Sequence, residues 1–249
     1  MENTPKTNRR NALGLIAGSV TFPFFSQSAQ AKPSLVLIEL FTSQGCSSCP
    51  PADKLAGALK KQPGVTVVTF NVDYWDYLGW RDTLAKPEYT QRQYDYAASM
   101  GESGVYTPQM VINGVAHVVG SQQRKIDAAV EASSKSNAFV DLRLTATDTE
   151  FIVDIAEGKA IAEATLWIMS IVPEVSVGIE RGENTGKKIV YHNVVNALVP
   201  AGMWTGKSTR LTLPRKAIVS RDTKGVIAVL QEGKVGRVLG LQRWGDVGA

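Results

Sequence analysis

The sequence predicts an α/β domain followed by a mainly antiparallel β-sandwich domain. Up to about residue 136, apolar strand-like runs alternate with helical patterns in the order β-α-β-α-β-β-α. Beyond that point, strand patterns follow one another with turn residues between them. The length of 249 residues and the hydrophobic content of 44% allow two such domains. We therefore expect an export signal at 1–31, an α/β domain at 32–136 and a β-sandwich domain at 137–249.

Residues 1–31 have the composition of an export signal. Basic residues, among them Arg9 and Arg10, precede an apolar run at 12–20 and a small-x-small cleavage motif at 29–31. We expect a mature chain that begins near Lys32 and is periplasmic or secreted, where cysteines meet an oxidising environment. An uncleaved membrane anchor is the alternative, and both the general and the twin-arginine export routes remain open.

Seven elements are expected in the α/β domain. Continuous apolar runs predict buried strands, and spaced apolar residues predict helices. The Asn113-Gly114 pair between two short β-type runs predicts a hairpin. The expected strands are 35–41, 65–72, 109–112 and 115–119, and the expected helices are 51–61, 86–100 and 122–133.

The remainder of the chain predicts strands alone. Residues 139–146 alternate strictly between apolar and polar side chains, as a half-buried strand does. Six further segments have strand character and are separated by turn residues, which is typical of a sandwich or an open barrel. These segments are 150–156, 162–172, 187–198, 207–214, 226–231 and 237–242.

Charge and hydropathy exclude two classes of function. The chain has 27 basic and 23 acidic residues, a formal net charge of +4, without a dense Lys/Arg stripe. Nucleic-acid binding is therefore not expected. No uncharged apolar run reaches the roughly 18 residues that a membrane span requires, so we expect no integral membrane segment in the mature chain.

The chemistry is expected at the two cysteines of the chain, Cys46 and Cys49. They form a CxxC motif between the first strand and the first helix, where a redox-active pair belongs. A thiolate at a helix start faces unpaired N–H groups, which lower its pKa. The second cysteine can then resolve a mixed disulfide that the first has formed.

Two other interpretations of the pair remain open. A structural disulfide suits an exported protein, although closing so short a loop stabilises the fold by only about 2 kcal/mol. Metal binding is the other alternative, and thiolates favour Cu(I). A zinc site needs about four ligands, whereas the chain offers two cysteines and two histidines. We expect neither a metal nor a cofactor.

Thr107-Pro108 supplies a second, independent indication. It precedes the expected strand at 109–112, where a thioredoxin-like fold places a cis-proline loop against its dithiol. We expect a cis bond here and expect Thr107 to contact a bound partner. The redox interpretation requires sulfur atoms at an accessible edge, with Pro108 opposite them.

Four segments resemble a family of exported bacterial proteins of unknown function with a thioredoxin-like first domain. They are LIELFTSQGCSSCPPAD, NVDYWDYLGW, VYTPQMVING and RGENTGKKIVYHNVV, and the resemblance covers roughly residues 34–241. It implies a thioredoxin-like fold with Cys46, Cys49 and Pro108 at its redox positions, and it implies no substrate. The chain departs from ordinary thioredoxins in its Pro50-Pro51 pair, which should delay the helix start.

Other residues are candidates for the same site. Glu39 lies on an apolar face of the first strand and could pass protons to Cys49, or it could meet a basic partner. Asp53, one turn past Cys49, is more simply a helix cap. Tyr74, Trp75 and Trp80 follow the second strand, and His192 lies on a second-domain strand.

We expect the three aromatic residues and His192 to contact the substrate. Loops at the carboxyl ends of parallel strands share one rim, which places the aromatic loop near the cysteines. Packing against the sheet is the alternative for the aromatics, and a structural role is the alternative for His192.

The sequence therefore predicts an exported thiol–disulfide oxidoreductase. Cys46 would attack, Cys49 would resolve, and the partner would be a protein or a small thiol or disulfide. The redox partner and the direction of electron transfer are open. The alternatives are a copper-handling protein and a non-catalytic binding module.

Overall fold

The computed structural model describes residues 1–2, 35–135, 139–159 and 163–248. The expected signal, apart from its first two residues, and the expected domain boundary near Ser136 lie outside these ranges. The described part of the chain contains four α-helices, one short 3-10 helix and eleven strands.

The centre of the sheet is a parallel pair, β1 (Val36–Thr42) and β2 (Val65–Asn71). Every residue of both strands is buried, as expected for β-branched and apolar runs covered on both faces. The other first-half elements are α1 (Pro50–Leu59), η1 (Asp76–Leu78), α2 (Pro87–Met100), β3 (Gln109–Ile112), β4 (Ala116–Val119) and α3 (Gln123–Ser134).

Local sequence explains the ends of these elements. Pro50 and Pro51 occupy the first turn of α1, where their missing N–H groups would be unpaired in any case. The expected delay of the helix start is therefore wrong, and Cys49 is the N-cap residue. Asn113 (φ 47°) and Gly114 (φ 69°) form the tight turn between β3 and β4, which confirms the hairpin.

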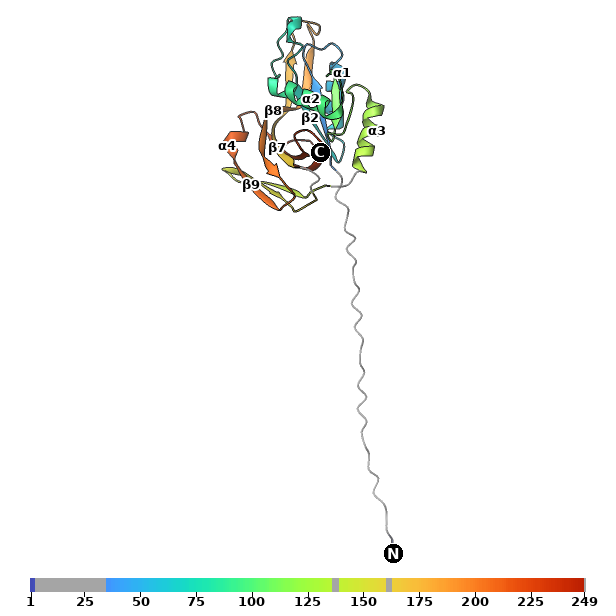
Figure 1. Cartoon of the computed structure of the whole chain (residues 1–249), viewed down its shortest axis with the longest axis vertical. Coiled ribbons are helices and arrows are strands. Elements are labelled where there is room, and N and C mark those ends of the chain that lie inside the picture. The colour runs from blue at the N-terminus through green and yellow to red at the C-terminus, as the bar shows by residue number, and fades with distance from the viewer. Residues whose placement is uncertain (3–34, 136–138, 160–162, 249) are drawn as a thin grey trace. The chain divides into compact units, whose positions relative to one another are not determined.

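The second half contains seven strands, two of them much longer than expected. β7 (Ala164–Gly178) and β8 (Lys188–Trp204) form a long antiparallel hairpin that runs beside α1 and α2 (Figure 1). The other elements are β5 (Leu142–Ala146), β6 (Glu150–Ile155), β9 (Thr209–Pro214), α4 (Arg215–Ile218), β10 (Gly225–Glu232) and β11 (Val238–Gly245).

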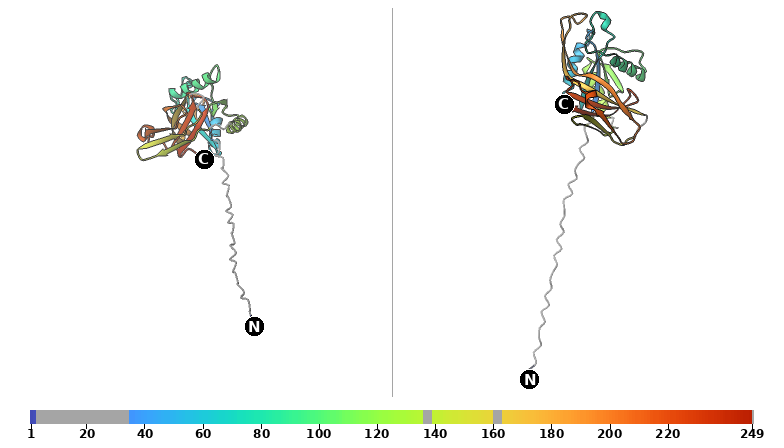
Figure 2. Two further views of the ribbon diagram at one scale, coloured as in Figure 1. Left: turned by 60° about the horizontal axis from the view of Figure 1, so that its bottom comes forward. Right: turned by 90° about the vertical axis from the view of Figure 1, so that its left-hand side faces the viewer.

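The strand order overturns the predicted fold class. Eight strands from both halves form one mixed sheet in the order β11-β10-β7-β8-β2-β1-β3-β4. Only β5, β6 and β9 form a separate sheet within the described residues. A thioredoxin-like α/β domain followed by an independent sandwich is therefore wrong: the molecule is mostly β, and both views of Figure 2 show late strands continuing beside early ones.

The two halves meet at one parallel bridge, Thr69↔Val194, between β2 and β8. Asn193, with φ 47°, strengthens this seam. Its Nδ2 donates to the carbonyl oxygens of Val67 and Val247, both at 2.9 Å. The Thr69 hydroxyl donates to the His192 carbonyl at 2.7 Å.

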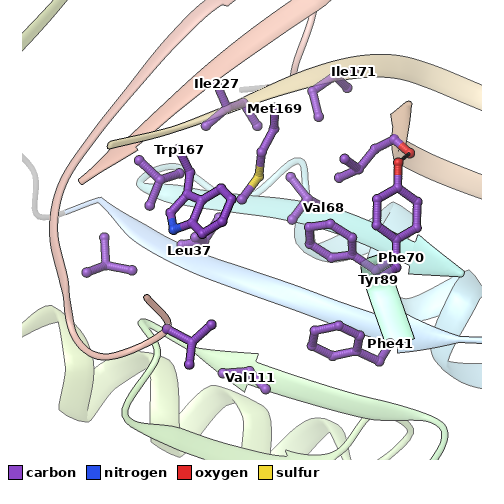
Figure 3. Close-up of a cluster of buried hydrophobic side chains, with 14 of the residues drawn as sticks. Leu37, Phe41, Val68, Phe70, Tyr89, Val111, Trp167, Met169, Ile171 and Ile227 are labelled. Carbon is purple, nitrogen blue, oxygen red and sulfur yellow. Dashed lines mark hydrogen bonds between the residues drawn. The ribbon is translucent and has the colours of Figure 1, made fainter. Parts of the chain in front are cut away.

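The largest core lies between the two halves. Trp167 and Met169 of β7 point toward Leu37 and Val68 of β1 and β2 (Figure 3). Since β8 and β2 separate β7 from β1 in the strand order, this packing requires the sheet to curl over on itself. The curl brings β7 and β10 over the face of the sheet that α2 also covers, through Tyr89 and Tyr96.

Candidate active site

The two cysteines form a disulfide in the loop between β1 and α1. Cys46 and Cys49 are joined, with a Cα–Cα distance of 5.4 Å. The Cys49 carbonyl accepts the N–H groups of Ala52 and Asp53, at 2.8 and 3.2 Å. The pair thus stands directly at the N-terminus of α1, with the second cysteine as its cap.

Both cysteines are covered in this oxidised state. Cys46 is 1% exposed and Cys49 is 0% exposed, whereas Ser47 and Ser48 between them face solvent. The expected accessible sulfur edge is therefore wrong for this conformation. Any exchange at the disulfide requires a movement of the segments that cover it.

The aromatic loop after β2 lies beside the CxxC loop. Trp75 packs on Gly45, because a Cβ placed at Gly45 would lie 3.0 Å from the Trp75 Cβ. The Trp75 Nε1–H donates to Thr107 Oγ1 at 2.7 Å. Tyr74 contacts Trp75 and donates its hydroxyl to Gln93 Oε1 at 3.2 Å. Two predicted contact residues, Trp75 and Thr107, thus meet beside the CxxC loop.

Gln44 connects the CxxC loop to the same aromatic loop. Its Oε1 accepts the Trp80 Nε1–H at 2.9 Å, and its backbone N–H donates to Asp82 Oδ2 at 2.7 Å. From the other side, Asn184 donates its Nδ2 to the carbonyls of Gln44 and Cys46, at 2.9 and 2.8 Å. Asn184 is fully buried and comes from the β7–β8 hairpin, so the second half of the chain holds the disulfide loop.

Pro108 follows a cis peptide bond, as the sequence predicts. Its carbonyl accepts the Gly120 N–H at 2.9 Å. A Cβ at Gly120 would lie 3.1 Å from the Ala52 Cβ and 3.2 Å from the Pro108 Cβ. Pro108 therefore faces the first turn of α1 across Gly120.

Asp53 is the most unusual titratable group beside the disulfide. It lies one turn past Cys49, is 1% exposed, and neither carboxyl oxygen has a hydrogen-bond partner. Burial raises its pKa to about 8; the Thr42 hydroxyl acts against this shift, and Asp82 adds to it. The expected capping role is not observed, because no side chain caps α1.

Asp53 belongs to a cluster of buried polar side chains that also contains Tyr191 and Asp82. Burial raises the pKa of Tyr191, and Asp53 and Asp82 raise it further, while the Tyr191 hydroxyl has no hydrogen-bond partner. Burial also raises the pKa of Asp82, against hydrogen bonds from Asn71 and Gln44. Two carboxyl groups with raised pKa values thus lie near one phenol.

His192 of β8 contacts helix α1 directly. A Cβ at Gly57 would lie 2.4 Å from His192 Nε2, so the imidazole rests on the glycine. Burial lowers the pKa of His192, and Lys60 lowers it further, while Glu174 at 3.5 Å raises it. His192 and Asp53 line the same cavity.

Glu39 is engaged elsewhere. Its two carboxylate oxygens accept a fork of hydrogen bonds from Arg92, at 2.6 and 3.0 Å, and one oxygen also accepts the Tyr96 hydroxyl. Both charged residues are buried. The basic partner, which was the alternative interpretation of Glu39, is what the structure shows.

Sequence reasoning missed Asp53 and Asn184 as site residues. Asp53 shares a helix face with Ala56 and Gly57, and a carboxyl group on such an apolar face is a signal for burial. Asn184 gave no comparable signal, since its partners lie more than 130 positions away. Among the described residues, no group of three or more His, Cys, Asp or Glu side chains is arranged to hold a metal. No helix there is long and apolar enough to cross a membrane.

Comparisons relate this chain to one sequence family and to two solved structures. The sequence model of the family "Protein of unknown function (DUF1223)" matches residues 37–231. A crystal structure of an Agrobacterium tumefaciens protein is 32% identical, with a TM-score of 0.75, covering 86% of this chain and 95% of that one. HBP35 of Porphyromonas gingivalis shares the fold at 12% identity, with a TM-score of 0.59, covering 86% of this chain and 75% of that one. None of the curated proteins matches the sequence.

Proposed function

This chain belongs to the DUF1223 family, and since membership assigns no activity, we propose from the site alone that it is a thiol–disulfide oxidoreductase. The reactive group is the Cys46–Cys49 pair. Its partner is a protein or a small thiol or disulfide. The features of residues 1–31 support export to an oxidising compartment.

The observation that carries the proposal is the unpaired carboxyl of Asp53. A buried carboxyl without a hydrogen-bond partner costs stability, so a purely structural loop gains nothing from it. With a pKa of about 8, Asp53 holds and releases a proton near neutral pH. A thiol that must lose its proton before attacking requires such a group nearby.

The reaction balances with these groups alone. The Cys46 thiolate attacks a substrate disulfide, forming a mixed disulfide and releasing one substrate thiolate. The Asp53 carboxylate then takes the proton of the Cys49 thiol. The Cys49 thiolate attacks Cys46 Sγ, re-forms the protein disulfide and releases the second substrate thiolate. Two electrons pass from the dithiol to the substrate, and the reverse sequence oxidises a substrate dithiol.

Access to the sulfur atoms requires the segments around the CxxC loop to move. Trp75 and Trp80, on the aromatic loop beside it, each donate one side-chain hydrogen bond, to Thr107 and Gln44. Both indoles are partly exposed, and hydrogen bonds of this kind contribute only about 1 kcal/mol each. Movement of the aromatic loop therefore has a modest cost in free energy.

A second candidate is a binding module whose disulfide is structural. The full burial of both cysteines favours it, because a covered disulfide resists exchange. In that case Asp53 would simply remain protonated beneath the loop.

Reduction and trapping separate the two candidates. We expect the folded wild-type protein to be reduced by millimolar dithiothreitol, measured by alkylation and mass spectrometry. The reduced protein should then transfer its electrons to insulin or to a small dialkyl disulfide. Cys46→Ala should abolish this transfer, and Cys49→Ala should accumulate a mixed disulfide at Cys46.

Two results would contradict the oxidoreductase proposal. A disulfide that resists reduction in the folded protein, but yields in urea, establishes the structural alternative. Transfer by wild type no faster than by Cys46→Ala refutes the oxidoreductase.

A further inference from the structure

A cavity of about 450 Å³ lies between the first turns of α1 and the start of β8. Pro50, which directly follows Cys49, forms part of its lining, together with the apolar Ile189 and Val190. The volume is in the range of sites that hold a ligand of a few tens of atoms. The cavity therefore begins one residue from the disulfide and has the size for a small exchange partner.

The charge of the cavity is mostly positive. Lys54 lies on α1, and Lys187 and Lys188 lie at the start of β8; all three line the cavity and are exposed. The one lining carboxyl, Asp53, stays largely protonated at neutral pH because burial raises its pKa to about 8. Three positive charges thus face the cavity with little compensation inside it.

The charges near His192 do not reverse this balance. Glu174 lies 3.5 Å from the imidazole and is largely exposed, whereas Lys60 and Lys61 act on the same imidazole with the opposite sign. Lys187 has a further connection: its Nζ donates to Asn184 Oδ1 at 2.8 Å. Asn184 in turn holds the Cys46 carbonyl, so the positive rim is linked to the cysteine loop.

We propose that this cavity binds the carboxylate groups of a low-molecular-weight thiol or disulfide, and that such acidic small molecules are the preferred exchange partners. Lys54 and Lys188 attract the carboxylates, and Ile189 and Val190 contact the aliphatic part. The inference rests on the oxidoreductase function and names its substrate class.

The step is the reverse of the exchange described above. The thiolate of the small molecule attacks Cys46 Sγ, the Cys46–Cys49 bond breaks, and Cys49 leaves as a thiolate that takes the Asp53 proton. A second molecule of thiol attacks the mixed disulfide, releasing the oxidised small molecule and the protein dithiol. The small thiol supplies both electrons.

Three thiols of similar size and different charge test the preference. They are 3-mercaptopropionate, 2-mercaptoethanol and cysteamine, which add a negative, no and a positive charge to the thiolate. The rate of reduction of the oxidised full chain is measured per thiolate and divided by the rate for a free Cys-Ser-Ser-Cys peptide disulfide, which removes differences in intrinsic reactivity. At low ionic strength we expect 3-mercaptopropionate to exceed cysteamine by about tenfold or more, and salt to reduce the ratio.

Charge-reversal variants locate the effect. Lys54→Glu combined with Lys188→Glu should remove or invert the preference. Lys216→Glu, an exposed lysine on α4, is the matched control and should keep it. Both variants change exposed side chains and should fold, which circular dichroism verifies.

Three other outcomes distinguish failure of the substrate class, of the cavity assignment and of the oxidoreductase function. Equal normalised rates for the three thiols overturn the substrate class and leave the oxidoreductase standing. A preference that survives the double variant overturns the assignment to this cavity. Failure of all three thiols to reduce the folded protein overturns the oxidoreductase and this inference together.

Discussion

Two buried carboxyl groups in the first half of the chain have opposite surroundings. Glu39 meets the guanidinium of Arg92, so its negative charge is paired. The carboxyl oxygens of Asp53 have no hydrogen-bond partner among the described residues, and burial favours the neutral form. The sequence indicated Glu39 because it lies on an otherwise apolar face of the first strand. Periodicity identifies that face, but it cannot identify Arg92 as the residue that packs against it.

The surroundings of Asp53 predict a specific pH dependence of stability. Its folded pKa of about 8 lies above its unfolded value of 3.8, so stability is highest below 3.8 and is lost as pH rises toward 8. The slope is about 1.4 kcal/mol per pH unit, or about 3 kcal/mol between pH 5 and 7. Asp53→Asn removes the titrating group and should remove this loss.

Urea unfolding of the oxidised protein at pH 5, 6 and 7 measures the effect. The unfolding free energy of Asp53→Asn should rise relative to that of wild type across the series. Asp148→Asn, at an exposed turn position, is a control that should follow wild type. Parallel curves for wild type and Asp53→Asn contradict a raised pKa at this position.

Helix α1 packs closely against the second half of the chain at Gly57. Gly57 lets the helix approach β8 closely enough for His192 to rest on it. In an open helix, Gly→Ala gains about 1 kcal/mol of helix propensity. Here the added methyl group would overlap the imidazole, and overpacking costs about 1–3 kcal/mol.

We therefore expect Gly57→Ala to destabilise the protein and His192→Ala to rescue it. In the double variant the methyl group occupies space that the imidazole has left. Thermal unfolding of wild type, both single variants and the double variant forms a mutant cycle, and the expected coupling is favourable. Additive effects would contradict a steric contact between position 57 of α1 and the His192 imidazole of β8.

At this scale the sequence was informative. All seven second-half strands and the helices α1, α2 and α3 appear where they are expected, and all but β7 and β8 lie close to their expected bounds, because hydrophobic period and turn residues are local signals. The lengths of β7 and β8 were underestimated at their C-terminal ends, residues 173–178 and 199–204, where most residues are partly or fully exposed. The added residues of β7 extend the hairpin toward its turn.

For the whole molecule, the decisive feature is the seam between β2 and β8. Periodicity cannot reveal which strands pair, so the sequence predicted two separate sheets. A single bridge at Thr69, with the side-chain bonds of Asn193, joins the halves into one sheet. The positive φ of Asn193 is a conformation that most residues adopt only with strain.

Because β2 and β8 join the two halves of the chain in one sheet, we expect both halves to unfold together. Asn193→Ala loses two buried hydrogen bonds and strains the backbone, which should cost about 2–4 kcal/mol. Asn193→Gly relieves the backbone strain and should lose less. Circular dichroism and tryptophan fluorescence should give one coincident transition in wild type and in both variants. Two separate transitions in the wild-type protein contradict a shared sheet.

The burial of both cysteines has a kinetic consequence. A reagent in dilute solution reacts only with the small fraction of molecules in which the covering segments have moved aside, so its observed rate is the intrinsic rate multiplied by that fraction. At high reagent concentration every opening event leads to reaction, and the observed rate reaches a maximum. This maximum is the opening rate of the protein itself, which is the same for every reagent.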